Sequence, residues 1–168
     1  MMKCAVDLHI HSCLSPCADG DMTPCNIAGM AYVKHLDCIA LTDHNAAENL
    51  PAAALAAREM GVCLLPGIEV TSSEEVHILC YFPAVDPAVD FGRMIYDHLP
   101  PLPNNKRIFG NQMILGPEDE AQGELSKLLI QATDLSIVEI ESRCTEAGGI
   151  CVAAHINRSS NSLLGNLG

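Results

Sequence analysis

The chain has 168 residues, of which 49% are hydrophobic, and its formal net charge is −12. This length and hydrophobic content suffice for one domain with a core, whereas the acidic balance, with a pI near 4.8, argues against binding of nucleic acid through a basic face. Because the sequence shows neither a signal-peptide pattern nor an apolar stretch of about 18 residues, we expect a soluble cytoplasmic protein without a membrane segment.

The first half of the chain alternates short apolar runs with helix-like segments, a pattern typical of βα units around a parallel sheet. Thr23-Pro24 predicts a helix N-terminus, because threonine caps helices and proline suits the first turn. Gly61 predicts the end of an alanine-rich helix. The predicted elements are strand 4–11, helix 23–34, strand 38–42, helix 47–60, strand 62–65 with a continuation to 71, strand 76–82 and helix 87–98.

The second half begins with a segment rich in proline and glycine, which breaks this alternation. We interpret residues 99–124 as an insertion in a single domain spanning 1–168, with a hairpin formed by 112–115 and 121–124. This insertion either covers the site and selects the substrate or is a plain surface hairpin. Ser136 and Glu139 then predict a capping box for a helix ending near Ala147, and 150–154 is the last predicted strand.

Histidines and carboxylates stand at or just after the ends of the predicted strands. His9 and His11 are two residues apart, so on a strand both rings face the same side, about 7 Å from each other. The carboxyl ends of parallel strands meet at one edge, so these side chains should converge there. One such histidine is usually structural, but the repetition favours metal binding. The candidate ligands are His9, His11, Asp19, His44, Glu69, His77 and His155.

These ligand types indicate which ions the chain would bind. Imidazole and carboxylate groups suit zinc, manganese or iron, and this many ligands exceed the needs of one tetrahedral ion. We therefore expect two or three divalent metal ions, with the Glu69 carboxylate as a bridge between two of them. His35 and His98 lie at helix ends instead, where surface or capping roles are expected.

The nine cysteines match no paired CxxC pattern. Those in apolar runs are expected to be buried free thiols. Cys13 and Cys17 lie in the loop after His11, next to the proposed metals, so both a structural role and a role at the site stay open. The cysteines in apolar runs are Cys4, Cys38, Cys63, Cys80 and Cys151.

Six short motifs connect the sequence to a known family. They are DLHIHS at 7–12, ADG at 18–20, LTDHN at 41–45, PGIEVT at 66–71, VHIL at 76–79 and AH at 154–155. With these motifs, in this order, the chain resembles the PHP family, the polymerase and histidinol phosphatase metallohydrolases. The resemblance implies an α/β fold, a distorted (β/α)7 barrel, with a metal cluster, usually of three ions, that hydrolyses phosphate esters.

The resemblance also implies three ligand sets. Asp43 is expected to orient a ligand histidine from outside the set, a role that metal-binding imidazoles commonly need. Arg158 either pairs with a substrate phosphate or is an exposed arginine without a specific role. The sets are His9, His11 and Glu69 for the first ion, Glu69, His77 and His155 for the second, and Asp19 with His44 for the third.

The sequence departs from the family at its C-terminal end. Family members carry an Asp-x-His motif on a later strand, and nothing after His155 matches it. We therefore expect the barrel to be incomplete at the C-terminus in this chain, and the first and third ligand sets to be incomplete with it. The second set needs no residue from that region.

The leading functional hypothesis is a metal-dependent phosphoesterase in which a metal-activated hydroxide attacks a small phosphorylated metabolite or nucleotide. Glu69, His77, His155 and Arg158 are the expected catalytic residues. Aromatic residues make up only 4% of the chain, so base-stacking platforms are few and nucleic acids other than short oligonucleotides are disfavoured. Two alternatives stay open: a noncatalytic metal-binding or regulatory domain, and a nuclease-like accessory domain acting on 3′ ends.

Overall fold

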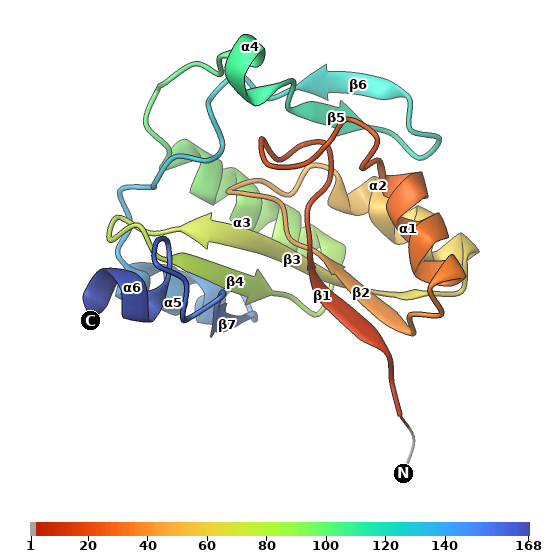
Figure 1. The fold of residues 1–168 in the computed structure, drawn as a ribbon, viewed down its shortest axis with the longest axis horizontal. Helices are drawn as coiled ribbons and strands as arrows, with labels where there is room; N and C mark the ends of the chain where they lie inside the picture. Colours follow the sequence, from red (N-terminus) through yellow and green to blue (C-terminus); the bar gives the residue numbers. More distant parts are fainter. Residues whose placement is uncertain (1–2) are drawn as a thin grey trace.

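The computed structural model describes residues 3–168, which contain a five-stranded mixed sheet with the order β1-β2-β3-β4-β7 (Figure 1). β1, β2 and β3 are parallel, whereas β4 is antiparallel to β3 and β7 is antiparallel to β4. β5 and β6 form a separate antiparallel hairpin. The strands are β1 (Val6–Ile10), β2 (Cys38–Leu41), β3 (Cys63–Thr71), β4 (His77–Tyr81), β5 (Met113–Leu115), β6 (Ala121–Glu124) and β7 (Ile150–Ala153).

Four helices pack against one face of the sheet and form the main core with it. Phe91 and Ile95 of α3 and Ile140 of α5 are buried there against Val70 and Ile78 of the sheet. Each such side chain contributes about 1.5–3 kcal/mol by leaving water. The helices of this layer are α1 (Pro24–Val33), α2 (Leu50–Glu59), α3 (Val85–Asp97) and α5 (Ile137–Glu146), and the short helices elsewhere are α4 (Lys106–Phe109) and α6 (Leu163–Leu167).

The fully parallel sheet expected from the βα rhythm is only partly correct. Ser72 to Val76 alone connect β3 to β4, and a parallel crossover needs about a dozen residues or more, so the two strands form a hairpin. The α/β class is confirmed. Residues 3–168 form an open sheet edged by β1 and β7 and not a closed barrel, so the (β/α)7 count is not confirmed.

The opposite face of the sheet has a different surface. Leu79 and Tyr81 are buried in a small apolar cluster there, but Leu8 and Val152 are partly exposed, at 36% and 47%. Cys63 is exposed as well, and so is Cys4, which contradicts the expectation that both would be buried. Of the other cysteines expected to be buried, Cys80 is buried, whereas Cys38 and Cys151 are only partly buried. The apolar run around Cys63 did not reveal which of its side chains would face the helices.

The helix ends agree with their sequence signals. The Thr23 side chain accepts a hydrogen bond from the Asn26 backbone N–H and Pro24 occupies the first turn of α1. Ser136 and Glu139 form the predicted capping box of α5. The boundaries differ more at α2, which begins at Leu50 rather than at residue 47, and at α3, which begins at Val85 rather than at 87.

The predicted hairpin of the second half is present as β5 and β6, and Figure 1 shows it beside the loop that follows β1. Ile114 packs into a second apolar cluster with Leu14 of that loop. Asn49 connects the same parts, because its side chain donates to Ser12 Oγ and accepts from the Leu115 backbone N–H. The hairpin therefore supports the loop after β1 from outside the sheet.

Candidate metal centre

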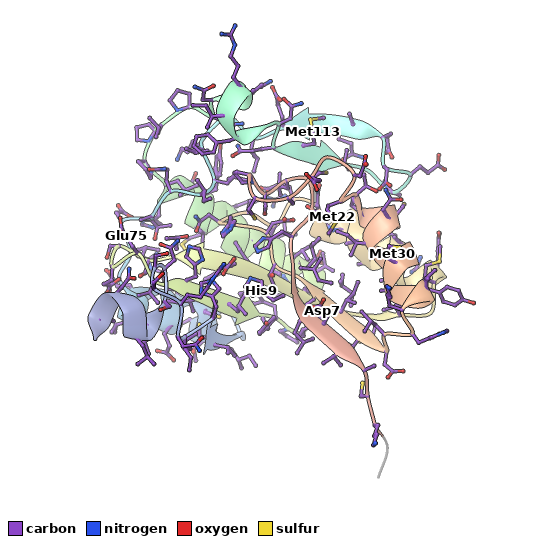
Figure 2. All side chains as sticks on the ribbon, viewed as in Figure 1. Asp7, His9, Met22, Met30, Glu75 and Met113 are labelled. Carbon is purple, nitrogen blue, oxygen red and sulfur yellow. The ribbon has the colours of Figure 1, made fainter. Side chains whose placement is uncertain are left out.

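The histidines predicted as ligands come together at one edge of the sheet. His9 is on β1, His44 follows β2, and His155 follows β7. Figure 2 shows His9 near the middle of the molecule, with Asp7 nearer the N-terminal end of the same strand. The sequence pattern placed His77 at or after the end of a strand, but in the structure His77 is the first residue of β4. Because β4 runs antiparallel to β3, its amino end lies at the edge where β1, β2 and β3 end.

The Glu69 carboxylate is the centre of this group. It is on β3, is 1% exposed, and lies between five imidazole rings. Backbone hydrogen bonds hold Glu69 beside the segment that contains His44. The Glu69 N–H donates to the Asp43 carbonyl, and the Asn45 N–H donates to the Glu69 carbonyl. The ring nitrogens lie 3.1 Å (His9 Nε2), 3.1 Å (His11 Nε2), 3.4 Å (His44 Nδ1), 3.1 Å (His77 Nδ1) and 3.3 Å (His155 Nε2) from a Glu69 oxygen.

The protonation of these groups suits metal binding. Burial opposes ionisation of Glu69, but the imidazoles of His11, His77 and His9, which contact the carboxylate, outweigh it and hold the Glu69 pKa well below its usual range. Burial lowers the pKa of His44 to about 3 and also lowers that of His155. The hydrogen bond with Glu69 raises the pKa of His9. His44 and His155 are therefore neutral at pH 7, the form in which imidazole binds metals.

A hydrogen-bond chain orients His11. Ser15 Oγ donates to Asp43 Oδ1 over 2.6 Å and lies 3.2 Å from His11 Nδ1. Since the hydroxyl proton is used on Asp43, Ser15 accepts from His11, which places the ring proton on Nδ1 and leaves the Nε2 lone pair free. Asp43 was expected to orient a ligand histidine from outside the ligand set, and in the structure it reaches His11 through Ser15. Burial raises the Asp43 pKa, against hydrogen bonds from Ser12 and Ser15.

The resulting arrangement fits a cation. His11 Nε2 lies 3.1 Å from Glu69 Oε2 and 3.2 Å from His9 Nε2, and with the ring proton on Nδ1 the Nε2 lone pair faces the space between these atoms. The Nδ1 atoms of His44 and His155 are buried without a hydrogen-bond partner among the described residues. His9, His11 and Glu69 form one group whose ligand atoms lie within 4.8 Å of one another, and His44, Glu69 and His77 form another. Both groups share Glu69, as a bridging ligand would require.

These side chains line a cavity of about 370 Å³. The cavity contains six of the seven expected ligands and also Arg158, whose side chain is exposed and supplies a positive charge. Asp19 is exposed and does not line this cavity, whereas Cys17 does. The residues are His9, His11, Cys17, His44, Glu69, His77, His155 and Arg158.

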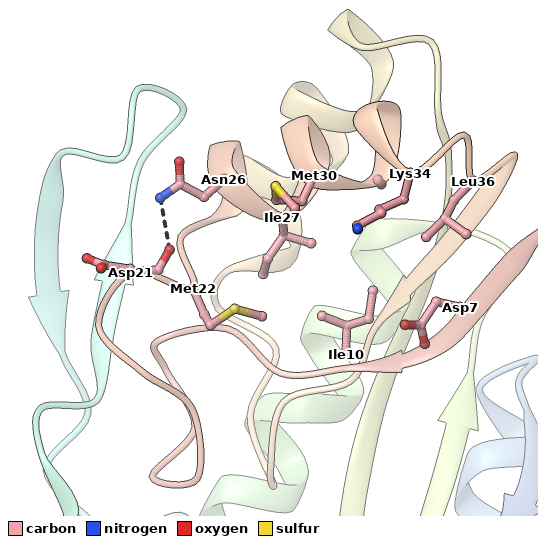
Figure 3. Close-up of a pocket in the computed structure, with 10 residues that line it drawn as sticks. Asp7, Ile10, Asp21, Met22, Asn26, Ile27, Met30, Lys34 and Leu36 are labelled. Carbon is pink, nitrogen blue, oxygen red and sulfur yellow. Dashed lines mark hydrogen bonds between the residues drawn. The ribbon is translucent and has the colours of Figure 1, made fainter.

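A larger cavity of about 470 Å³ lies between β1 and α1 and has a different chemistry (Figure 3). Its lining is mainly apolar and includes Ile10, Met22 and Ile27, with Lys34 and Asp7 at its border. No imidazole lines it, so its larger volume does not make it the centre of the chemistry.

The sequence profile of the PHP domain matches residues 7–158. The chain belongs to the PHP domain family. This confirms the resemblance seen in the motifs, and the matched segment contains every candidate ligand of this PHP domain.

Two curated relatives align with about half of this PHP domain. A 5'-3' exoribonuclease of Haemophilus influenzae is 34% identical over 76 residues, covering 44% of the chain and 27% of the relative. A 3',5'-nucleoside bisphosphate phosphatase of Chromobacterium violaceum is 38% identical over 86 residues, covering 49% of the chain and 28% of the relative. The alignments thus span only about a quarter of each relative's length.

Solved structures share the fold at lower identity. A protein of Bifidobacterium adolescentis assigned as a metal-dependent phosphoesterase superposes with a TM-score of 0.62 at 23% identity, covering 93% of this chain and 68% of its own. An amidohydrolase of Chromobacterium violaceum, solved with sulfate, gives 0.61 at 22% identity, with coverages of 91% and 67%. Endonuclease Q of Pyrococcus furiosus gives 0.58 at 20% identity, with coverages of 94% and 36%. In residues 3–168 we find no helix with the length and apolar character to cross a membrane.

Proposed function

We propose that this PHP domain is a metal-dependent phosphoesterase that acts on a small phosphorylated nucleotide or metabolite. The observation that carries the proposal is the buried Glu69 carboxylate surrounded by imidazole nitrogens at 3.1–3.4 Å. Such a set, with neutral histidines and a shared carboxylate, suits two or three divalent ions of zinc, manganese or iron. The names of the phosphatase and exoribonuclease relatives support phosphate-ester hydrolysis as the reaction class.

The residues that line the cavity would have two roles, metal binding and phosphate binding. His9 and His11 with Glu69 would hold one ion, Glu69 with His77 and His155 a second, and His44 would contribute to a third. When bound, such ions supply a hydroxide nucleophile from water at neutral pH and neutralise charge on the phosphate. The exposed Arg158 guanidinium would bind a phosphate oxygen at the mouth of the cavity, because guanidinium and phosphate form strong charge-assisted hydrogen bonds.

The charge of the molecule favours a small substrate. With a net charge of −12, the chain repels a long polyanion, and only local cations attract a phosphate. The bisphosphate phosphatase relative supports a nucleotide carrying phosphate groups. The exoribonuclease relative supports a second candidate, cleavage of short oligonucleotides from an end.

A hydrolysis panel tests the proposal. The purified chain, loaded in turn with zinc, manganese or iron(II), is incubated with mononucleotides, a nucleoside 3′,5′-bisphosphate and short oligonucleotides, and phosphate or nucleotide release is measured. We expect release that a chelator abolishes and that Glu69→Gln reduces to the metal-free level, because the amide no longer bridges two ions. Release from the bisphosphate favours the phosphatase, and release of mononucleotides from oligomers favours the exonuclease. Full metal occupancy without turnover on the panel would support the noncatalytic alternative instead.

A further inference from the structure

The loop after β1 brings a cysteine into the candidate metal centre. Cys17 lines the same cavity as the histidines, and its Sγ belongs to a group with His11 and His44 whose ligand atoms all lie within 4.8 Å of one another. Asp19, the carboxylate expected for this position, is two residues farther along and outside the cavity.

Two tight turns explain why the loop presents Cys17 rather than Asp19. The Ala18 N–H donates to the Ser15 carbonyl, so Pro16 and Cys17 form the corner of a turn, with proline in the position that its fixed φ favours. The Met22 N–H donates to the Asp19 carbonyl, which makes Asp19 the first residue of a second turn.

The first turn is tied to the metal centre at its starting residue. Ser15 is 1% exposed, its Oγ donates to Asp43, and it accepts a hydrogen bond from the His44 backbone N–H. The same Oγ contacts His11 Nδ1. Cys17 is therefore two residues from Ser15, whose hydroxyl also contacts His11 and the backbone of His44. The positions of Cys17, His11 and His44 depend on this one residue.

We propose that Cys17 is a thiolate ligand for a metal ion bound beside His44 and His11 in this centre. The inference rests on the metal dependence of the proposed function and adds a ligand to it. Binding of the ion releases the thiol proton, because the thiolate is the form of cysteine that binds metals.

A sulfur ligand changes the choice of metal. Thiolate is soft and selects zinc or iron over magnesium and manganese, which prefer oxygen ligands. The metal preference of this position would then differ from that of a position completed by the Asp19 carboxylate. We expect the chain to retain a zinc or cobalt ion at this position under conditions in which manganese is washed out.

Cobalt(II) substitution tests the ligand directly. Thiolate bound to cobalt gives a near-ultraviolet charge-transfer band that imidazole and carboxylate ligands do not give. We expect Cys17→Ser to abolish the band from this position and to lower the bound cobalt by one ion per chain. Cys17→Asp, which restores a charged ligand, should keep the ion but not the band.

The control variants separate Cys17 from other ligands. Cys80, Cys144 and Cys151 form a thiol group with sulfur atoms within 4.8 Å of one another, so Cys144→Ser tests for cobalt bound there and should leave the band in place. Asp19→Asn should also leave the band and the ion unchanged. Circular dichroism of each variant confirms that it is folded.

Two outcomes would overturn the inference. A band that survives Cys17→Ser and vanishes in Cys144→Ser would assign the thiolate to the other group. Loss of one ion in Asp19→Asn, with none lost in Cys17→Ser, would return the position to the carboxylate. Neither measurement uses a substrate, so the inference can fail while the hydrolysis panel succeeds, and the reverse.

Discussion

Ser15 satisfies three groups of the centre with one hydroxyl. It donates to Asp43 and accepts from the His44 backbone N–H and from His11 Nδ1, which uses its proton and both lone pairs. The hydroxyl therefore fixes which nitrogen of His11 carries the proton. The other nitrogen, Nε2, faces Glu69 and is free to bind a cation.

Removal of this hydroxyl is expected to weaken metal binding without unfolding the chain. In Ser15→Ala, His11 loses the partner that sets its tautomer, and loss of such an outer partner lowers metal affinity about 10–100-fold. Competition with a chromophoric chelator measures the affinity. Ser142→Ala, on the exposed surface of α5, is the matched control and should bind as the wild type does. An unchanged affinity in Ser15→Ala would show that His11 is oriented by other contacts.

At the scale of elements, α3 packs unusually closely against the segment after His44. A Cβ on Gly92 would lie 2.7 Å from Ala47 Cβ and 3.2 Å from Ala47 N, closer than side chains normally approach. Gly29, in α1, is the opposite case, since a Cβ there would meet nothing within 4 Å. The sequence alone does not distinguish these two helical glycines.

The two positions should respond in opposite directions to alanine. Gly92→Ala is expected to lower the free energy of unfolding by about 1–3 kcal/mol, because a methyl group is forced into a packed contact. Gly29→Ala should raise it by about 0.5–1 kcal/mol, because glycine weakens a helix interior. Urea denaturation measures both. Equal effects of the two substitutions would contradict the close packing of α3.

At the scale of the whole molecule, the buried histidines of the metal centre make the folded chain less stable in acid. Burial lowers the pKa of His44 to about 3, whereas in the unfolded chain it is about 6.5. Between these values the unfolded state binds more protons than the folded state, so stability falls as the pH falls below about 6.5. His155 acts in the same direction, whereas the raised pKa of His9 opposes it. The Glu69 pKa is lowered, so the stability that its ionised carboxylate provides is lost only when the pH falls below 4.5, the ordinary pKa of the side chain.

The metal-free chain should therefore lose stability between pH 7 and pH 5. We expect the free energy of unfolding to fall over this range, and to fall less steeply in His44→Gln, which cannot be protonated. His35→Asn replaces an exposed histidine with a residue that tolerates its positive φ of 55°, and should keep the wild-type slope. Urea denaturation in the presence of a chelator gives the slopes, and equal slopes for wild type and His44→Gln would disprove the role of His44.

Much of the fold and of the centre follows from local patterns in the sequence. The cap at Thr23, the capping box of Ser136 and Glu139 and the hairpin of β5 and β6 were predictable, because each depends on residues close together in the chain. The direction of β4 was also encoded, in the five residues between β3 and β4, but the regular βα rhythm suggested a parallel strand. The short motifs at the strand ends are sufficient to identify the PHP family.

By itself, the sequence determined the family, the main elements and the set of histidines with Glu69. The tertiary structure decided how that set is completed: Asp43 reaches His11 through Ser15, and Cys17 rather than Asp19 enters the cavity. Asp43 and Ser15 are 28 residues apart, and their hydrogen bond sets the turn that carries Cys17. Periodicity shows which face of a strand a side chain occupies, but the direction of a loop side chain depends on contacts between segments that only folding brings together.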